Sequence, residues 1–207
     1  MSVSDEAKGL MPGTDAAIPG DFVCRLSVEQ YHQMARAGIL SEDSPLELLD
    51  GWLVPKMTKN PPHSVVTDRV RRALEQTLPA GWLVRSQEPI TLSASEPEPD
   101  VAVVRGELDD YLERHPEPHE VALVVEVSDI SLRRDRTTKK RLYAEAGIPL
   151  YWIVNLLDRH IEVYGDPSGP GESPDYRARR DFAATDAIPV VIDGRSIGEV
   201  AAREILR

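Results

Sequence analysis

Two kinds of hydrophobic pattern alternate along this chain. Continuous apolar runs at 100–105, 121–127 and 150–155 are typical of strands that are buried on both faces of a sheet. Between the last two runs, residues 132–146 carry apolar positions at helical spacing. A strand, a helix and a strand in this order indicate a right-handed crossover, which would make the last two strands parallel. We therefore predict the α/β (α+β) class, with a mixed central β-sheet flanked by helices.

Capping and turn residues predict the elements on either side of these runs. Ser27 opens an S-x-x-Q capping box and marks the start of a helix. The pair Asp50–Gly51 predicts a two-residue hairpin whose first strand holds Glu47. A second helix is expected to begin near Asn60 and to carry His63 on its inward face. The other predicted segments are strands at 82–85, 88–92, 176–182 and 188–192, a hairpin at 159–164, and loops at 106–120 and 165–175.

Length and composition indicate one globular domain. Of the 207 residues, we assign 21–207 to that domain and 1–20, which are rich in Pro, Gly, Ser and acidic residues, to a flexible N-terminal arm. The single cysteine excludes an intrachain disulfide. No apolar run approaches the roughly 18 residues of a membrane span, and the acidic start does not resemble a signal peptide. We expect a cytoplasmic protein with no membrane partner.

The charge balance limits how the chain can bind nucleic acid. Twenty-four Lys and Arg residues stand against 35 Asp and Glu, which gives a net charge of -11. Proteins that rely on phosphate contacts usually carry a basic surface, and this chain as a whole repels polyanions. Any polyanion site must therefore be local and assisted by bound cations.

Asp100 and Glu126 are the first candidates for chemistry, because each lies at one end of a buried apolar run. If the two strands pair antiparallel, the start of one meets the end of the other and the carboxylates converge. Two adjacent buried acids repel each other, so one must be protonated or a cation must lie between them. A hard cation such as Mg²⁺ suits such a pair. The alternative is that both acids lie at solvated strand ends.

Lys139 and Glu47 are the next candidates. Leu142, Tyr143 and Ala146 follow Lys139 at three, four and seven positions, so this lysine shares the apolar face of its helix. Its ammonium either meets buried carboxylates or extends along the surface to water. Glu47 lies in a hairpin strand and, taken alone, could equally be a structural glutamate of an edge strand.

Several short motifs follow one another in a fixed order along the chain. They are GIL (38–40), ELLDG (47–51), His63 with its helix, EPDVAVV (98–104), LVVEVSD (123–129), DRTTKKRLYAEAGIPLYWIVN (135–155) and VIDG (191–194). Together they resemble the PD-(D/E)XK nuclease superfamily, and the wider sequence, about 22–206, is similar to its branch of Uma-type restriction endonucleases. The superfamily pattern has a lysine two residues after the second acid, where this chain has Ser128. The branch it resembles moves that lysine to the following helix, at the position of Lys139.

The resemblance implies a restriction-endonuclease-like core and a metal-dependent endonuclease that hydrolyses phosphodiester bonds, above all in DNA. It assigns catalytic roles to Glu47, Asp100, Glu126 and Lys139. Asp100 and Glu126, with the Val127 carbonyl, would bind Mg²⁺, for which Mn²⁺ would substitute. Glu47 would bind a second metal or anchor the first through water, and Lys139 would position the attacking water or stabilise developing charge.

The resemblance also bears on partners and on alternatives. DNA would bind through this local metal-bridged site, and a homodimer would suit cleavage of both strands. Two basic clusters either contact the DNA backbone or are solvated helix faces: Arg133, Arg134, Arg136, Lys140 and Arg141, and Arg69, Arg71 and Arg72. His63 matches a recurring histidine, for which a hydrogen-bonded structural role is favoured. The alternative function is an inactive nucleic-acid-binding or scaffold protein on a nuclease fold.

Overall fold

A computed structural model describes residues 23–41 and 44–207 of the chain. The arm predicted at 1–20 lies outside these residues, so that prediction stays untested. Among the described residues, no helix combines the length and the apolar character needed to cross a membrane.

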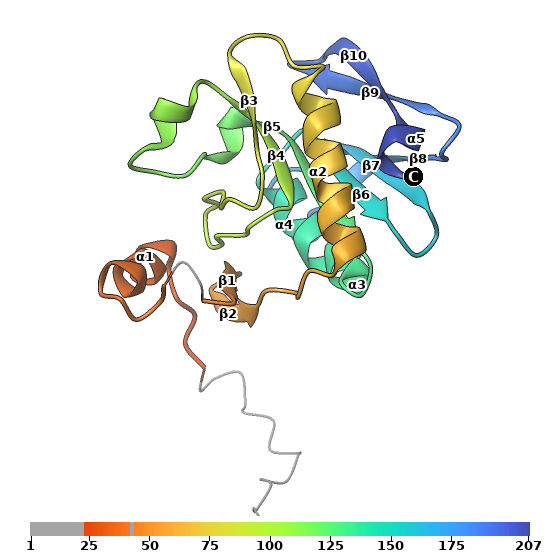
Figure 1. Cartoon of the computed structure of the whole chain (residues 1–207). Helices are drawn as coiled ribbons and strands as arrows, with labels where there is room; N and C mark the ends of the chain where they lie inside the picture. Colours follow the sequence, from red (N-terminus) through yellow and green to blue (C-terminus); the bar gives the residue numbers. More distant parts are fainter. Residues whose placement is uncertain (1–22, 42–43) are drawn as a thin grey trace, which may run out of the picture.

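The centre of the fold is a six-stranded mixed sheet in the order β3-β4-β5-β6-β7-β8 (Figure 1). Its strands are β3 (Trp82–Arg85), β4 (Val101–Arg105), β5 (Val121–Ser128), β6 (Leu150–Asn155), β7 (His160–Pro167) and β8 (Tyr176–Phe182). Strands β5 and β6 pair parallel, and the other neighbours pair antiparallel. The predicted fold class and the parallel crossover between β5 and β6 are therefore confirmed.

Helices cover both faces of this sheet. The long helix α2 (Pro61–Glu75) crosses one face, and the helical segment that connects β5 to β6 covers the other (Figure 1). That segment consists of α3 (Leu132–Arg134), a π turn η4 (Asp135–Lys139) and α4 (Lys140–Glu145). The remaining elements are α1 (Val28–Arg36), β1 (Leu46–Leu49), β2 (Trp52–Pro55), the 3₁₀ turns η2 (Leu108–Tyr111) and η3 (Pro118–Glu120), β9 (Ala187–Ile192), β10 (Arg195–Ala201) and α5 (Ala202–Ile205).

Alternation along the central strands divides the interior into two cores. On β5, Val125 and Val127 pack in the core under α2, whereas Val124 packs with Leu142 and Tyr143 under α4. Every residue of β5 is buried, as expected for a strand covered on both faces. The same alternation directs the next even-numbered residue of β5, a glutamate, toward α4.

The hairpin β1–β2 has the predicted register, with Glu47 opposite Val54. Its turn requires glycine for two reasons. Gly51 has a φ of +78°, and a Cβ atom there would lie 2.7 Å from the Cβ of Arg25 and 2.8 Å from the carbonyl of Leu26. The turn therefore lies directly against the chain segment that leads into α1.

Two local predictions differ from the structure. The strand predicted at 88–92 was wrong: Ile90 and Leu92 are buried, but their backbone amides bond to Pro97 and Ser95 within the same loop. The hairpin strand β10 and helix α5 were missed, because the segment that begins at Arg195 shows neither clean alternation nor a helical stripe.

Candidate active site

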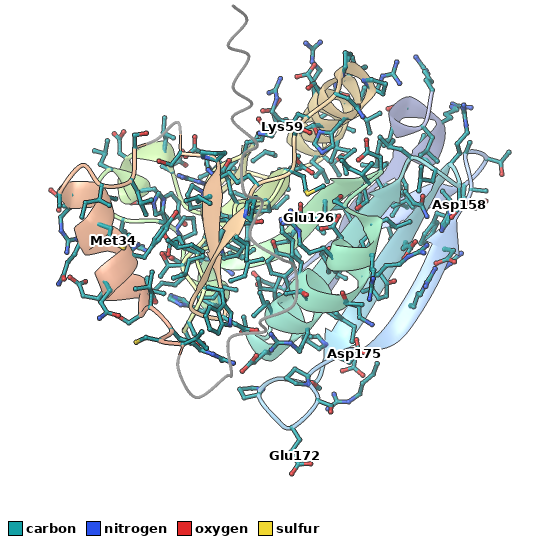
Figure 2. The ribbon with its side chains drawn as sticks, turned by 90° about the horizontal axis from the view of Figure 1, so that it is seen from below. Met34, Lys59, Glu126, Asp158, Glu172 and Asp175 are labelled. Carbon is teal, nitrogen blue, oxygen red and sulfur yellow. The ribbon has the colours of Figure 1, made fainter. Side chains whose placement is uncertain are left out.

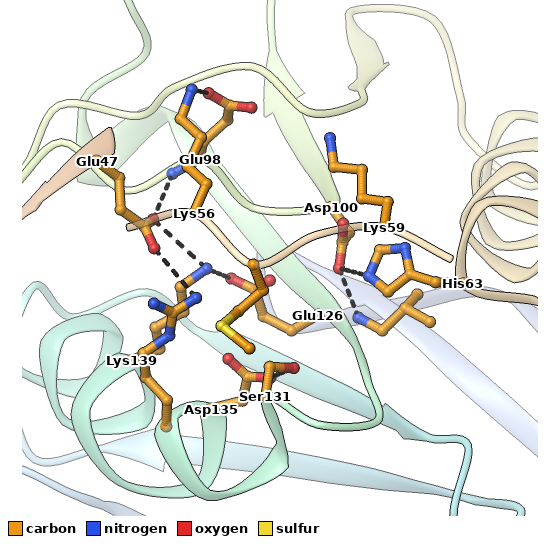
Figure 3. Close-up of a pocket in the computed structure, with 13 residues that line it drawn as sticks. Glu47, Lys56, Lys59, His63, Glu98, Asp100, Glu126, Ser131, Asp135 and Lys139 are labelled. Atoms are coloured by element: carbon orange, nitrogen blue, oxygen red, sulfur yellow. Dashed lines mark hydrogen bonds and ion pairs between the residues drawn. The ribbon is translucent and has the colours of Figure 1, made fainter. Parts of the chain in front are cut away.

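A small cavity of about 50 Å³ opens where β4 begins and β5 ends (Figure 3). A volume of this size holds an ion and a few water molecules but no larger ligand. All four predicted catalytic residues line it. The lining residues are Glu47, Lys56, Met57, Lys59, His63, Glu98, Asp100, Glu126, Val127, Ser131, Arg134, Asp135 and Lys139.

Asp100 is held from two sides. Strands β4 and β5 pair antiparallel, so the residue before β4 reaches the end of β5, where the Val127 amide donates to Asp100 Oδ2 at 2.8 Å. On the other side, His63 Nε2 lies 3.1 Å from the same oxygen (Figure 3). His63 is placed there by the first turn of α2, which Asn60 caps. The histidine therefore orients the carboxylate, in keeping with the structural role favoured from the sequence.

Glu126 meets the lysine that the helical pattern singled out. Lys139 Nζ donates to Glu126 Oε1 at 2.8 Å, and the Tyr143 hydroxyl donates to the same oxygen at 2.8 Å. Lys139 is 4% exposed and Glu126 is 4% exposed. The alternatives of a lysine extending to water and of acids at solvated strand ends are thus excluded by the burial of these side chains.

A π turn explains how Lys139 reaches the site. The turn η4 spans Asp135–Lys139, and such a turn holds one residue more than an α-helical turn, so it changes which side chains face inward. Both of its end residues are buried. Asp135 Oδ2 accepts hydrogen bonds from the hydroxyls of Ser128, at 2.7 Å, and Ser131, at 2.6 Å. Ser128 stands where the superfamily pattern has its lysine, and its hydroxyl holds the Asp135 carboxylate of the following helix in place.

Glu47 comes from the hairpin and closes the cavity from a third direction. Its Oε2 lies 3.6 Å from Lys139 Nζ, and its Oε1 lies 3.4 Å from a guanidinium nitrogen of Arg134. The backbone amide of Glu98 donates to Oε2 at 3.3 Å. At 2% exposure, Glu47 is not a solvated edge-strand residue.

The two basic clusters, for which DNA contact and a solvated helix face were both left open, are largely paired with acids. Arg136 pairs with Glu162, and Lys140 pairs with Asp175 at 2.8 Å. In the second cluster, Asp68 pairs with two arginines of α2. These pairings favour the interpretation of both clusters as ordinary helix faces. Arg134 is the exception, because it points into the catalytic cavity.

Burial sets the electrostatics of the site. Desolvation raises the pKa of Glu126 to about 8, although the ammonium of Lys139 opposes that shift and the carboxylates of Asp135 and Asp100 add to it. Burial opposes the charge on Lys139 as well, but Glu126 and Glu47 outweigh it and raise the pKa of the lysine. Lys139 is therefore a permanent cation, which suits it for holding negative charge rather than for accepting a proton.

The donor set fits a hard divalent cation that keeps much of its water. Among the described residues, no hydrogen bond is made to Asp100 Oδ1 or to Glu126 Oε2, so each carboxylate has one oxygen free. In the same part of the chain, no three His, Cys, Asp or Glu side chains converge closely enough to hold a metal by themselves. Mg²⁺ typically binds through one or two carboxylates and fills its other positions with water and substrate phosphate.

Comparison with known proteins agrees with this geometry. The family Uma2, described as "Putative restriction endonuclease", matches residues 28–194. The chain belongs to the Uma2 family. A crystal structure of a "putative nuclease belonging to DUF820" from Anabaena variabilis ATCC 29413 superposes with a TM-score of 0.67 at 14% identity, over 87% of this chain and 97% of that one. No curated protein sequence matches the chain.

Membership in Uma2 confirms the resemblance drawn from the motifs and supports a hydrolytic nuclease. The match with Uma2 includes all four predicted catalytic residues, and it ends at the turn before β10. Three further site residues were not singled out from the sequence. Asp135 and Tyr143 lie four residues before and after Lys139 on the same helical stripe, which was a usable signal, whereas the inward turn of Arg134 has none.

Proposed function

We propose that this chain is a Mg²⁺-dependent endonuclease that hydrolyses phosphodiester bonds in DNA. The observation that carries the proposal is the pair of buried carboxylates, Asp100 and Glu126, each with one oxygen free, beside a buried ammonium that is 2.8 Å from the second acid. When bound, Mg²⁺ would supply positive charge that activates water for attack on phosphorus and offsets charge on the leaving oxygen.

The protein's own groups have distinct tasks in this proposal. Asp100 and Glu126, with the Val127 carbonyl, would hold the cation, and Glu47 would anchor it through water or bind a second ion. Lys139 remains charged, so it would orient the attacking water and stabilise the negative charge that develops on the phosphate oxygens. His63 and the Val127 amide keep Asp100 Oδ2 occupied, which directs Oδ1 toward the cavity.

Local charge reconciles DNA binding with a net charge of -11. Lys59 lines the cavity and is exposed, and it makes no ion pair with any described residue. Arg134 faces the same cavity. With a divalent cation present, these groups would give the catalytic cavity a positive surface, while the rest of the molecule stays acidic.

The test is nicking of supercoiled plasmid DNA by purified protein in Mg²⁺ or Mn²⁺, with chelator as the blank. Asp100→Asn and Glu126→Gln are each expected to lower the rate by more than about a hundredfold. Glu172→Gln, a same-chemistry change on an exposed loop far from the site (Figure 2), is the matched control and should leave the rate unchanged.

Calorimetry separates the enzyme from an inactive scaffold. The enzyme predicts Mn²⁺ binding that is lost in Asp100→Asn and in Glu126→Gln. Nicking that survives both substitutions would show that the activity belongs to another protein or another site. Folded protein that neither binds Mn²⁺ nor nicks DNA would support the scaffold instead.

A further inference from the structure

A second, much larger cavity adjoins the catalytic one. It measures about 830 Å³, within the range of about 300–1,000 Å³ that is usual for small-molecule sites. Lys56 and Glu98 line both cavities, so the two are neighbours. Helix α1 forms one wall of the larger cavity, and the loop at 87–98 forms another. The catalytic cavity has no room for a nucleoside, whereas this neighbour has ample room for one.

Glu96, a buried carboxylate that lines the larger cavity, has one oxygen without a partner, and a side-chain shift must uncover that oxygen before a ligand can reach it. Glu96 is 2% exposed, and its Oε1 lies 3.1 Å from His32 Nε2 and accepts from the Thr91 hydroxyl at 3.2 Å. Its Oε2 is buried and has no hydrogen-bond partner among the described residues. Among the residues that the structure describes, no Lys or Arg side chain lies within 4 Å of the Glu96 carboxylate. His115, 3.7 Å from Oε1, likewise has a buried Nδ1 without a partner.

A buried carboxylate oxygen without a partner needs a hydrogen-bond donor, and an N–H group can supply one. Leaving a buried charged acceptor unpaired is costly, so a ligand that supplies the donor gains the binding energy. The exocyclic amino group of a nucleobase is such a donor, and acidic side chains accept from it in known readout contacts. The wall beside Glu96 adds flat surfaces, because the rings of Tyr31 and His32 lie 6.3 Å apart on α1. Bases stack on such side chains.

We propose that this cavity binds one unpaired, amino-bearing base of the substrate strand next to the scissile phosphate, with Glu96 accepting from the amino group. The proposal rests on the proposed nuclease function and names its substrate class. The base must be unpaired, because pairing in a duplex engages the amino group and stacking keeps it out of a cavity. Cytosine, adenine and guanine carry the amino group. Thymine lacks it, and its single ring N–H lies between two carbonyl oxygens that the carboxylate repels, so thymine should bind much more weakly.

Cleavage of short single-stranded oligonucleotides tests the preference. We expect oligo-dT that contains a single dC to be cut beside that nucleotide at least about tenfold faster than oligo-dT alone. Glu96→Gln should reduce the ratio to about threefold or less, and His32→Ala, at a partly exposed position that contacts Glu96, should reduce it as well. Glu172→Gln should preserve it. Equal cutting of both oligonucleotides, unchanged in Glu96→Gln, would overturn the proposal while leaving the nuclease intact.

Binding of free nucleotides tests the cavity without any cleavage. In chelator, dCMP but not dTMP should shift the ring proton resonances of His32 and His115 in the NMR spectrum, and Glu96→Gln should abolish those shifts. Circular dichroism and thermal unfolding show whether the variant is folded. Shifts with dCMP in a protein that cuts no DNA would sustain the base site and overturn the nuclease. Absence of shifts with either nucleotide would overturn the base site.

Discussion

Replacing Lys139 by Met removes the one charge on which the buried site depends and keeps most of the side-chain volume. The ammonium lies 2.8 Å from Glu126 Oε1 and 3.6 Å from Glu47 Oε2, and the residue is 4% exposed. The variant leaves Glu126 without its nearest cation and Glu47 with Arg134, 3.4 Å away, as its remaining one. Removing one partner of a buried ion pair typically costs about 3–5 kcal/mol, so we expect a loss of unfolding free energy of that order at alkaline pH.

The loss should grow with pH, because Glu126 can take up a proton. Burial raises the pKa of its carboxyl from the usual 4.5 to about 8, even though Lys139 opposes the shift. A raised pKa means that the folded protein holds the proton more tightly than the unfolded chain, so stability falls as pH rises between those values. Without Lys139, the pKa of Glu126 in the folded protein rises further. The variant should then continue to lose about 1.4 kcal/mol per pH unit where the parent protein has levelled off.

Urea unfolding in chelator, at about pH 6 and about pH 9, measures this difference. Lys140→Met is the matched control, since Lys140 makes the same kind of pair with Asp175 at the surface, at 2.8 Å. Its loss should be below about 1 kcal/mol at both pH values. The reasoning is refuted if the two variants lose the same stability, or if the gap between Lys139→Met and the parent is the same at both pH values.

Three further outcomes are expected. Tyr143→Phe removes a hydroxyl that donates to the buried Glu126, and it should lower the unfolding free energy by about 1–2 kcal/mol and weaken Mn²⁺ binding in calorimetry. Ser128→Lys, which restores the superfamily lysine at a position with 0% exposure, should destabilise by about 3 kcal/mol or more and should not restore nicking to Lys139→Met. Glu120→Gln should cost about 1 kcal/mol near neutral pH, since Arg114 lowers the pKa of Glu120 to about 2, and acid titration should show that the cost disappears as pH falls toward that value.

The parts of the site that follow from chain geometry could be predicted. Strand periodicity and antiparallel pairing bring Asp100 to Glu126, and they need only the positions of the two acids within apolar runs. The hairpin turn fixes the face of Glu47 in the same way. Lys139 was found from a helical stripe because its apolar companions lie on the same face. Each of these inferences depends on spacing within a single element or on one strand pair.

The parts that depend on contacts between distant elements could not be predicted. The contact between His32 and Glu96 joins α1 to a loop more than sixty residues later, and no local pattern marks that meeting. Arg134 looked like a member of a solvated basic cluster, yet packing turns it toward Glu47. Residues 88–92 include apolar side chains that pack in the core, but the amides of Ile90 and Leu92 bond within the loop and that of Thr91 bonds to Pro116, not to a neighbouring strand.

The extra residue in the turn at Asp135–Lys139 has a consequence for comparing this protein with its relatives. Deleting one residue there would restore an ordinary helical repeat and leave everything downstream in nearly the same orientation, because the wider turn absorbs the extra residue. An amine that occupies a given point in space can therefore sit at different positions along related chains, on a strand in one and on a helix in another. A comparison of residue spacing between motifs would miss that the two amines are equivalent, whereas a superposition on the site carboxylates would show it.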